Sequence, residues 1–308
     1  MPVEQLSGIT ITVADLDGTA AFYRSALGLV VEPGHPADPA WIRLLGVQPG
    51  SAAHVANVLV GRQTLRLLAF DPAGLPYPDR RASNDPWFQH VALVCGEIEM
   101  VWKRLQTSAP GTITAGGPVL LPPNTGSVSA FKFRDPEGHP LELIAFPPGV
   151  GDPVWQTADT GIAGYDHTAI SVMDVDRSIA FYTGLLGFRA AGRSLNRGPE
   201  QNRLDGLADC EVDVVALQPA LLATPHVELL HYRSPPGRAR EAQARADDVA
   251  AVCQIYRVTG LGALTRRLEA EGVTFVSTGV VTFDDDSKAV AIRDPDGHII
   301  VLTEQGSS

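Results

Sequence analysis

Short apolar strands alternate along the chain with amphipathic stretches of helical period. In residues 167–172, successive side chains fall on opposite faces of a predicted strand. Apolar residues then recur every three or four positions through residues 179–186, which predicts a helix with one buried face. Asp174 is a helix-starting residue type and Gly187 a helix-ending type. A strand followed by a helix is therefore the basic unit.

The unit is repeated. Five positions match at an offset of 159 (174 minus 15), since Asp15, Phe22, Tyr23, Leu27 and Gly28 correspond to Asp174, Phe181, Tyr182, Leu186 and Gly187. An Asp-Pro-x-Gly-His turn also recurs at this offset, ending at His139 and at His298, and we expect both histidines to be structural. The pattern predicts two halves, 1–150 and 160–308, each holding two modules of order β-α-β-β-β: residues 7–70, 87–147, 164–232 and 249–304.

Composition narrows the class of protein. The 308 residues are 44% hydrophobic and carry a net charge of -11, which argues against a nucleic-acid partner because such binding depends on basic patches. We find neither a signal-peptide pattern nor a run of about 18 apolar residues, so we expect no membrane association and a cytoplasmic location. The three cysteines are too few and too scattered for a disulfide framework, and we expect buried thiols.

Two motifs carry a family resemblance. One is His-x4-Val-x-Asp-x6-Phe-Tyr-x3-Leu-Gly from His167, and the other is Phe-Arg-Asp-Pro-Glu-Gly-His-Pro-Leu-Glu-Leu at residues 133–143. Together they resemble the vicinal oxygen chelate superfamily, which includes glyoxalase I, methylmalonyl-CoA epimerase, extradiol dioxygenases, and fosfomycin and bleomycin resistance proteins. The resemblance implies an α+β fold in which four βαβββ modules form two curled mixed β-sheets.

The resemblance also implies metal-ligand positions at the start of the first strand and within the last strand of each module. Only the middle modules have a histidine and a glutamate at these positions: His90 and Glu142 in the second, His167 and Glu228 in the third. The corresponding positions elsewhere are Gly8 and Arg66 in the first module, and Val301 with one of Val249, Cys253 or Gln254 in the fourth. We therefore expect the second module to pair with the third and the first with the fourth, giving one metal cleft.

Two imidazoles and two carboxylates suit one divalent ion, with Zn, Ni, Co, Mn and Fe(II) all left open. Such an ion would act as a Lewis acid toward a small substrate with adjacent oxygens. Glu142 and Glu228 are the candidate general acid and base. We predict a polar loop at residues 194–203 and expect substrate contacts from Asn196, Arg197, Gln201 and His226.

The pattern favours a glyoxalase-I-like lyase or isomerase that works by proton transfer. A dioxygenase using Fe(II) is an alternative, although the fourth module lacks the ligands that extradiol enzymes use. A non-catalytic protein that binds a small molecule or antibiotic is a third possibility and would need an aromatic-lined cleft without a metal. Four modules in one chain are compatible with a monomer or a homodimer.

Overall fold

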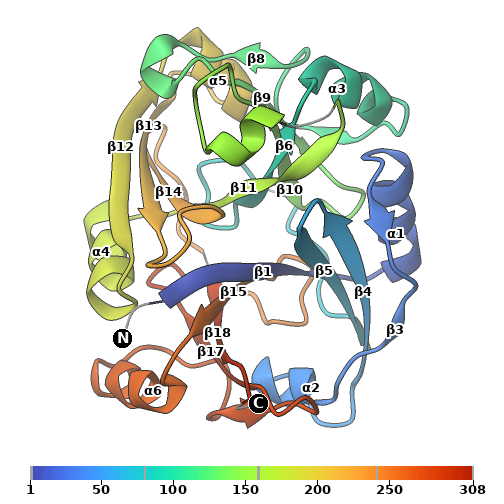
Figure 1. The fold of residues 1–308 in the computed structure, drawn as a ribbon, viewed down its shortest axis with the longest axis vertical. Helices are drawn as coiled ribbons and strands as arrows, with labels where there is room; N and C mark the ends of the chain where they lie inside the picture. Colours follow the sequence, from blue (N-terminus) through green and yellow to red (C-terminus); the bar gives the residue numbers. More distant parts are fainter. Residues whose placement is uncertain (1–2, 80, 158–159, 241, 307–308) are drawn as a thin grey trace.

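The computed structural model of the chain describes residues 3–79, 81–157, 160–240 and 242–306. Within these ranges the strands form two mixed sheets of nine strands each, which lie one above the other in Figure 1. The order in one sheet is β16-β17-β18-β15-β1-β5-β4-β2, with β3 beside β4, and in the other β12-β13-β14-β11-β6-β10-β9-β7, with β8 beside β9. The predicted α+β class with curled mixed sheets is confirmed.

The first half of the chain supplies the elements of the first two modules. The first module contains β1 (Val3–Val13), α1 (Leu16–Ser25), β2 (Val30–Val31), β3 (His35–Pro36), α2 (Ala40–Leu44), β4 (Ala52–Val60) and β5 (Gln63–Asp71). The second contains β6 (Gln89–Cys95), α3 (Ile98–Gln106), β7 (Gly111–Thr112), β8 (Val119–Leu120), η1 (Pro123–Thr125), β9 (Ser129–Arg134) and β10 (Pro140–Ala145). A short helix, η2 (Pro153–Thr157), follows.

The second half repeats this order. The third module contains β11 (Ile162–Ser171), α4 (Val175–Ile179), the π-helical turn η3 (Ala180–Leu185), β12 (Arg189–Arg197), α5 (Pro199–Asp205), β13 (Glu211–Gln218) and β14 (His226–Ser234). The fourth contains β15 (Val252–Val258), α6 (Leu261–Ala270), β16 (Val281–Thr282), β17 (Lys288–Arg293) and β18 (Ile299–Glu304). The polar loop predicted at residues 194–203 is wrong, because its two parts form the end of β12 and most of α5.

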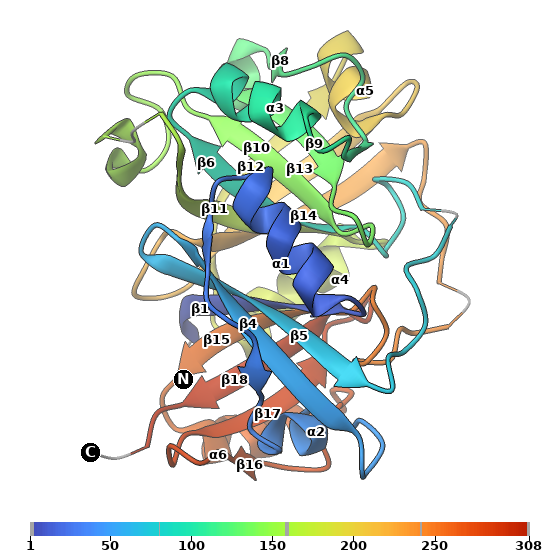
Figure 2. The same cartoon turned by 90° about the vertical axis from the view of Figure 1, so that its right-hand side faces the viewer.

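The first strands of the modules form the centre of each sheet. β6 pairs antiparallel with β11, and β1 pairs antiparallel with β15. The last strand of each module lies parallel to its own first strand, as β10 does to β6 and β14 to β11. One sheet thus combines the second and third modules, and the other combines the first and fourth (Figure 2).

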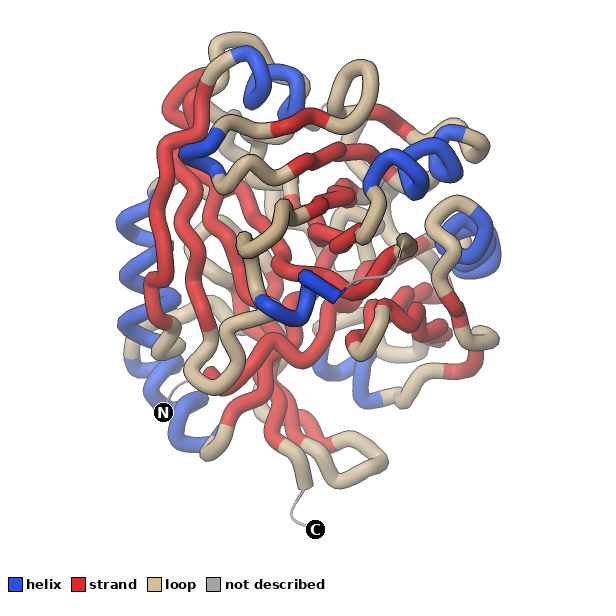
Figure 3. Tube along the Cα trace, turned by 45° about the horizontal axis from the view of Figure 1, so that its top comes forward, coloured by secondary structure: helices blue, strands red, loops and turns tan. Residues whose placement is uncertain are grey.

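The two faces of each sheet have different neighbours. Odd-numbered residues of β6, such as Val91 and Leu93, pack into one apolar core that also takes residues of β1, β15 and the helices. Even-numbered residues of β6 face the other way, into separate and smaller clusters. Figure 3 shows most helical segments at the periphery of the molecule, around the strands. The face away from the shared core is therefore where each sheet can hold a cleft.

Buried histidines of the repeated turn connect the sheets. His139 Nδ1 lies 2.8 Å from Asp135 Oδ2, and its Nε2 lies 2.9 Å from the Thr12 carbonyl of β1 and 2.7 Å from that of Val249. Both ring nitrogens face acceptors, so the imidazolium form satisfies all of them. Burial opposes that form, but the Asp135 carboxylate outweighs it and raises the pKa of His139. His298 makes the corresponding contact, with Nε2 3.2 Å from the Ser171 carbonyl of β11.

We expect His139→Ala to lower the free energy of unfolding by about 1–3 kcal/mol, because the carbonyls of Thr12 and Val249 lose a buried donor. Urea denaturation measures this difference. His54 is exposed on β4, and His54→Ala should change the free energy by less than about 0.5 kcal/mol. Equal effects of the two substitutions would contradict the role of His139.

The loss caused by His139→Ala should depend on pH. A raised pKa in the folded protein gives stability that is full below the unfolded value of about 6.5 and is lost as the pH rises through the folded value. The difference from wild type should therefore be larger at pH 6 than at pH 9. Burial lowers the pKa of His298 to about 3, so the matched His298→Ala difference should not shrink as the pH rises.

Candidate metal centre

The pairing of β6 with β11 brings the predicted ligands together. His90 lies opposite Ala169, and His167 lies opposite Ala92. In the flanking strands β10 and β14, Glu142 is level with Ala92, and Glu228 is level with Ala169. All four side chains project from the face away from the shared core, since residues two apart in a strand share a face. Alanine between the ligands leaves the space above the strands open.

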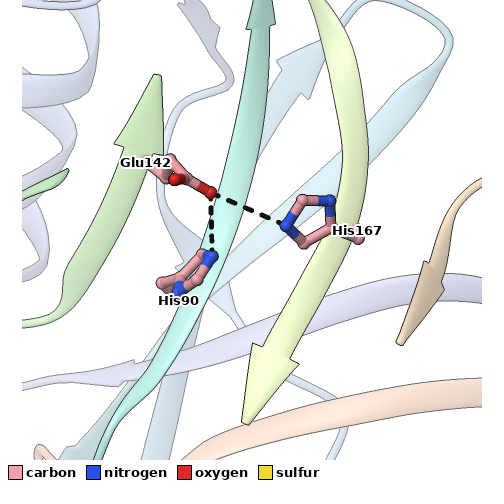
Figure 4. A group of neighbouring side chains, drawn as sticks. All are labelled: His90, Glu142 and His167. Atoms are coloured by element: carbon pink, nitrogen blue, oxygen red, sulfur yellow. Dashed lines mark ion pairs between the residues drawn. The ribbon is translucent and has the colours of Figure 1, made fainter. Parts of the chain in front are cut away.

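Figure 4 shows three of the predicted ligands, His90, Glu142 and His167, with the Glu142 carboxylate between the two imidazoles. Glu142 Oε2 lies 3.0 Å from His90 Nε2 and 3.6 Å from His167 Nε2. Glu228 Oε2 lies 3.5 Å from His167 Nε2. One ligand atom each from His90, Glu142 and His167 falls within 4.8 Å of the others. Three predicted ligands from three strands therefore form one cluster, and Glu228 adjoins it through His167.

The donor set fits a divalent ion. His90 is buried, and neither of its ring nitrogens has a hydrogen-bond partner, even though Nε2 lies close to the Glu142 carboxylate. A buried polar atom without a partner is costly, so the lone pair of His90 Nε2 is suited to binding a metal ion. Burial also lowers the pKa of His90, which keeps the ring neutral as metal ligation requires.

A second carboxylate holds His167 in place. Asp166 Oδ2 lies 3.1 Å from His167 Nδ1, and Asp166 Oδ1 accepts a hydrogen bond of 2.7 Å from Trp155 Nε1. With Nδ1 protonated toward Asp166, His167 Nε2 presents its lone pair to the cluster, the usual role of a carboxylate behind a ligating histidine. Asp166 was not among the residues predicted from the sequence. The strand has a register shift between Tyr165 and His167. Such a bulge re-aims side chains, which lets Asp166 reach the neighbouring His167.

Opposite charges are concentrated around the cluster. Burial by itself would raise the pKa of Glu142, but its close contact with His90, the positive charge of Lys132 and a hydrogen bond from His167 hold this pKa well below its usual range. Burial would lower the pKa of His167, but Glu228, Asp166 and Glu142 raise it well above its ordinary value. Without a metal, the cluster therefore holds a proton at His167 that a cation would displace.

The cluster forms the floor of a cavity of about 380 Å³, which we call the metal cleft. Helix α5 contributes Gln201, Leu204 and Asp205 to its wall. Lys132 Nζ lies 2.6 Å from Asp205 Oδ1, and Gln201 Nε2 donates to Asp205 Oδ2 at 2.7 Å. This buried ion pair ties α5 to β9 beside Glu142. Two aromatic residues of the described chain, Phe146 and Tyr232, also line the cleft.

The predicted substrate contacts occupy different places. Asn196 and Gln201 line the metal cleft. His226 lies beside it, with its ring centre 5.4 Å from that of His167 and its Nε2 3.7 Å from Glu228 Oε1. Arg197 does not line the cleft, because adjacent residues of β12 face opposite ways. Its exposed guanidinium instead forms an ion pair with Glu211 at 3.5 Å.

Strand register assigns the corresponding positions in the other sheet. Thr10 of β1 lies opposite Cys253 and level with Arg66, as Ala169 lies opposite His90 and level with Glu228. Ile255 lies opposite Gly8 and level with Val301, as Ala92 does for His167 and Glu142. The ligand positions of the other sheet are thus held by residues that form no equivalent metal set: Cys253, Val301, Gly8 and Arg66.

Solved structures with this fold include an enzyme, glyoxalase I, and a putative dioxygenase. Glyoxalase I from Zea mays superposes with a TM-score of 0.62 at 17% identity, covering 97% of this chain and 92% of that one. A putative dioxygenase from Bacillus subtilis gives a TM-score of 0.61 at 14% identity, covering 100% and 87%. These low identities establish the shared fold alone. No curated protein matches the sequence.

No helix among the described residues is long and apolar enough to cross a membrane.

The model of the Glyoxalase/Bleomycin resistance protein/Dioxygenase superfamily matches the chain twice, over residues 5–143 and 164–302. The two matches take in nearly the whole sequence and coincide with its two repeated halves. The chain therefore belongs to the Glyoxalase/Bleomycin resistance protein/Dioxygenase superfamily.

Proposed function

We propose that this protein is a metal-dependent enzyme, a glyoxalase-I-like lyase or isomerase that moves a proton on a small substrate with two adjacent oxygens. The cluster of His90, Glu142 and His167, with Glu228 beside His167 in the same cavity, carries the proposal. A divalent ion held there supplies Lewis acidity and fixes the orientation of the substrate oxygens. The imidazole and carboxylate donors suit Zn, Ni, Co, Mn and Fe(II).

The two glutamates differ in a way that suggests separate roles. The side chain of Glu142 is 6% exposed and lies between two histidines, which suits a ligand that stays in place. The side chain of Glu228 is 22% exposed and faces the cavity beside the small residue Ala216. We assign proton transfer mainly to Glu228, because it can reach a substrate without leaving a packed position.

Other residues of the chain orient the substrate and the base. His226 lies 3.7 Å from Glu228 Oε1 and can hold this carboxylate while the other oxygen faces the cleft. The charged Lys132 is buried beside Glu142 and Asp205, and it offers a positive charge to a substrate oxygen. Asn196 and Gln201 provide amide groups on the wall. Helix α5 excludes part of the solvent from the floor.

A dioxygenase is the second candidate, for a specific reason. His90, His167 and Glu142 form a cluster of two histidines and one carboxylate, a set that also suits Fe(II) in oxygen-using enzymes. The nearby Glu228 would add a second carboxylate, which favours the proton-transfer reading. Oxygen uptake with a catechol in the iron-loaded protein separates the two candidates.

The third candidate, a sequestering protein without a metal, has weaker support. Such a protein needs aromatic surfaces to hold its ligand by stacking. Among the described residues that line the metal cleft, the aromatic ones are Phe146 and Tyr232, whereas charged groups gather on its floor. Failure of the purified protein to bind any divalent ion would favour this candidate over both enzymes.

Metal binding should depend on the histidines of the cluster. We expect His90→Ala or His167→Ala to weaken the affinity for one divalent ion by more than about 100-fold, since even outer partners of ligands contribute about 10- to 100-fold. Titration calorimetry on metal-stripped protein with Zn, Ni, Co and Mn measures the affinity. His35 is exposed and far from the cluster in sequence, so His35→Ala should bind like wild type. Unchanged metal binding in His167→Ala would remove the proposal's basis.

Substitution of Glu142 and of Glu228 should have different effects on metal binding and on turnover. We expect Glu142→Gln to weaken metal binding strongly, because its carboxylate lies closest to both histidines. We expect Glu228→Gln to retain metal at saturating concentration while kcat falls by about 10²- to 10⁴-fold, the usual contribution of a positioned base. Turnover is measured on substrates found by screening diketones, hydroxy ketones, acyl-CoA thioesters and the adduct of methylglyoxal with glutathione.

The control for this pair is Glu269→Gln, on the exposed side of α6, which should leave kcat and metal content unchanged. If Glu228→Gln kept full turnover with full metal occupancy, the assignment of proton transfer to Glu228 would be wrong. Loss of turnover only in proportion to lost metal would reduce Glu228 to a ligand.

A further inference from the structure

The sheet of the first and fourth modules also contains a cavity, of about 290 Å³, which we call the second cleft. It lies over β1, β5, β15 and β18, on the face that corresponds to the metal cleft. Helix α2 places Trp41 and Leu44 in its wall, and Phe283, Ile255 and Val301 add apolar surface. Most of the corresponding face is filled by an apolar cluster, so the cavity is what remains open.

Arg66 is the positively charged residue that lines this cavity within the described chain. By strand register it holds the position of Glu228, so its side chain points into the second cleft as Glu228 points into the metal cleft. Its guanidinium lies over the Trp41 ring, 5.0 Å from the ring centre. Among the described residues it has no carboxylate within 4.0 Å and no hydrogen-bond acceptor.

The unpaired positive charge of Arg66 would be stabilised by a bound anion. Burial alone lowers the pKa of Arg66, and no carboxylate offsets this effect. A half-buried cation without a counterion retains a desolvation cost that a bound anion would relieve. A guanidinium binds a carboxylate by donating two parallel hydrogen bonds to its oxygens, a geometry that a lysine cannot reproduce.

The carboxylates of the same cavity are already engaged. Glu304 Oε1 accepts from the backbone amides of Gly260 and Leu261, and Asp285 Oδ1 accepts from the Ser287 amide at 3.0 Å. Neither forms an ion pair with Arg66. Their negative charges disfavour a ligand with a second anionic group. The walls of Trp41, Phe283 and Leu44 favour a ligand with an apolar body.

We propose that the second cleft is a binding site for a small monocarboxylate with an apolar body, anchored on Arg66 and packed against Trp41 and Phe283. The site is separate from the metal cleft and uses no metal. The duplication thus holds two binding sites of different chemistry, a cation site built on two histidines and two glutamates, and an anion site built on one arginine.

The test is titration calorimetry of the full chain with benzoate and hexanoate, each compared with its neutral amide. Wild-type protein should bind the acids and bind benzamide and hexanamide at least about 10-fold more weakly, as expected for a hydrogen bond to a charged group. Arg66→Met keeps an unbranched apolar stem, removes the guanidinium and should weaken acid binding about 10- to 100-fold. Arg66→Lys should fall between the two. Succinate should bind more weakly than hexanoate.

Two controls locate the site. Arg62→Met, exposed at the turn before β5, should bind benzoate like wild type. His167→Ala and treatment with a chelator should also leave benzoate binding unchanged. Both would abolish the binding of a carboxylate that is held by a metal ion. Absence of binding to wild type, equal binding of acid and amide, or loss of binding in His167→Ala would each overturn this proposal. The first two results leave open whether the metal cleft holds an ion, whereas the third would place the carboxylate in the metal cleft.

Discussion

The antiparallel pairing of β6 with β11 is the interaction on which the candidate site depends. It sets His90 and His167 on neighbouring strands, with one residue pair, Thr168 and Val91, between them along the ladder. The parallel partners, β10 and β14, then carry Glu142 and Glu228 to either side. A shift of one residue in this register would turn a histidine from the cleft into the apolar core, so packing and site geometry specify the same register.

The same framework produces two clefts of different character. In the sheet of β6 and β11, small residues such as Ala92 and Ala169 leave room above the ligands, and the pair of Lys132 and Asp205 supports one wall. In the other sheet, helix α2 and an apolar cluster occupy much of the equivalent face. The backbone frame is kept because it depends on the shared core, while the open faces are free to differ in chemistry.

The shared core and the turn histidines hold the two sheets together as one unit. His139 and His298 contact the first strands of the opposite sheet near Thr12 and Ser171. Their electrostatic settings are opposite, because Asp135 stabilises the charged form of His139 whereas burial keeps His298 neutral. A repeated motif can therefore keep its contact geometry while its protonation diverges.

The sequence by itself determined the α+β class, the fourfold module and the family, since strand alternation, helical spacing and repeated motifs are local signals. It also placed His and Glu at matching positions of the middle modules. Tertiary structure decided what depends on register between distant strands. A shift at Tyr165 brings Asp166 to His167, and the ladder makes Cys253 the counterpart of His90. Alternation in β12 turns Arg197 away from the cleft, because strand pairing, which the sequence does not state, sets which residues face it.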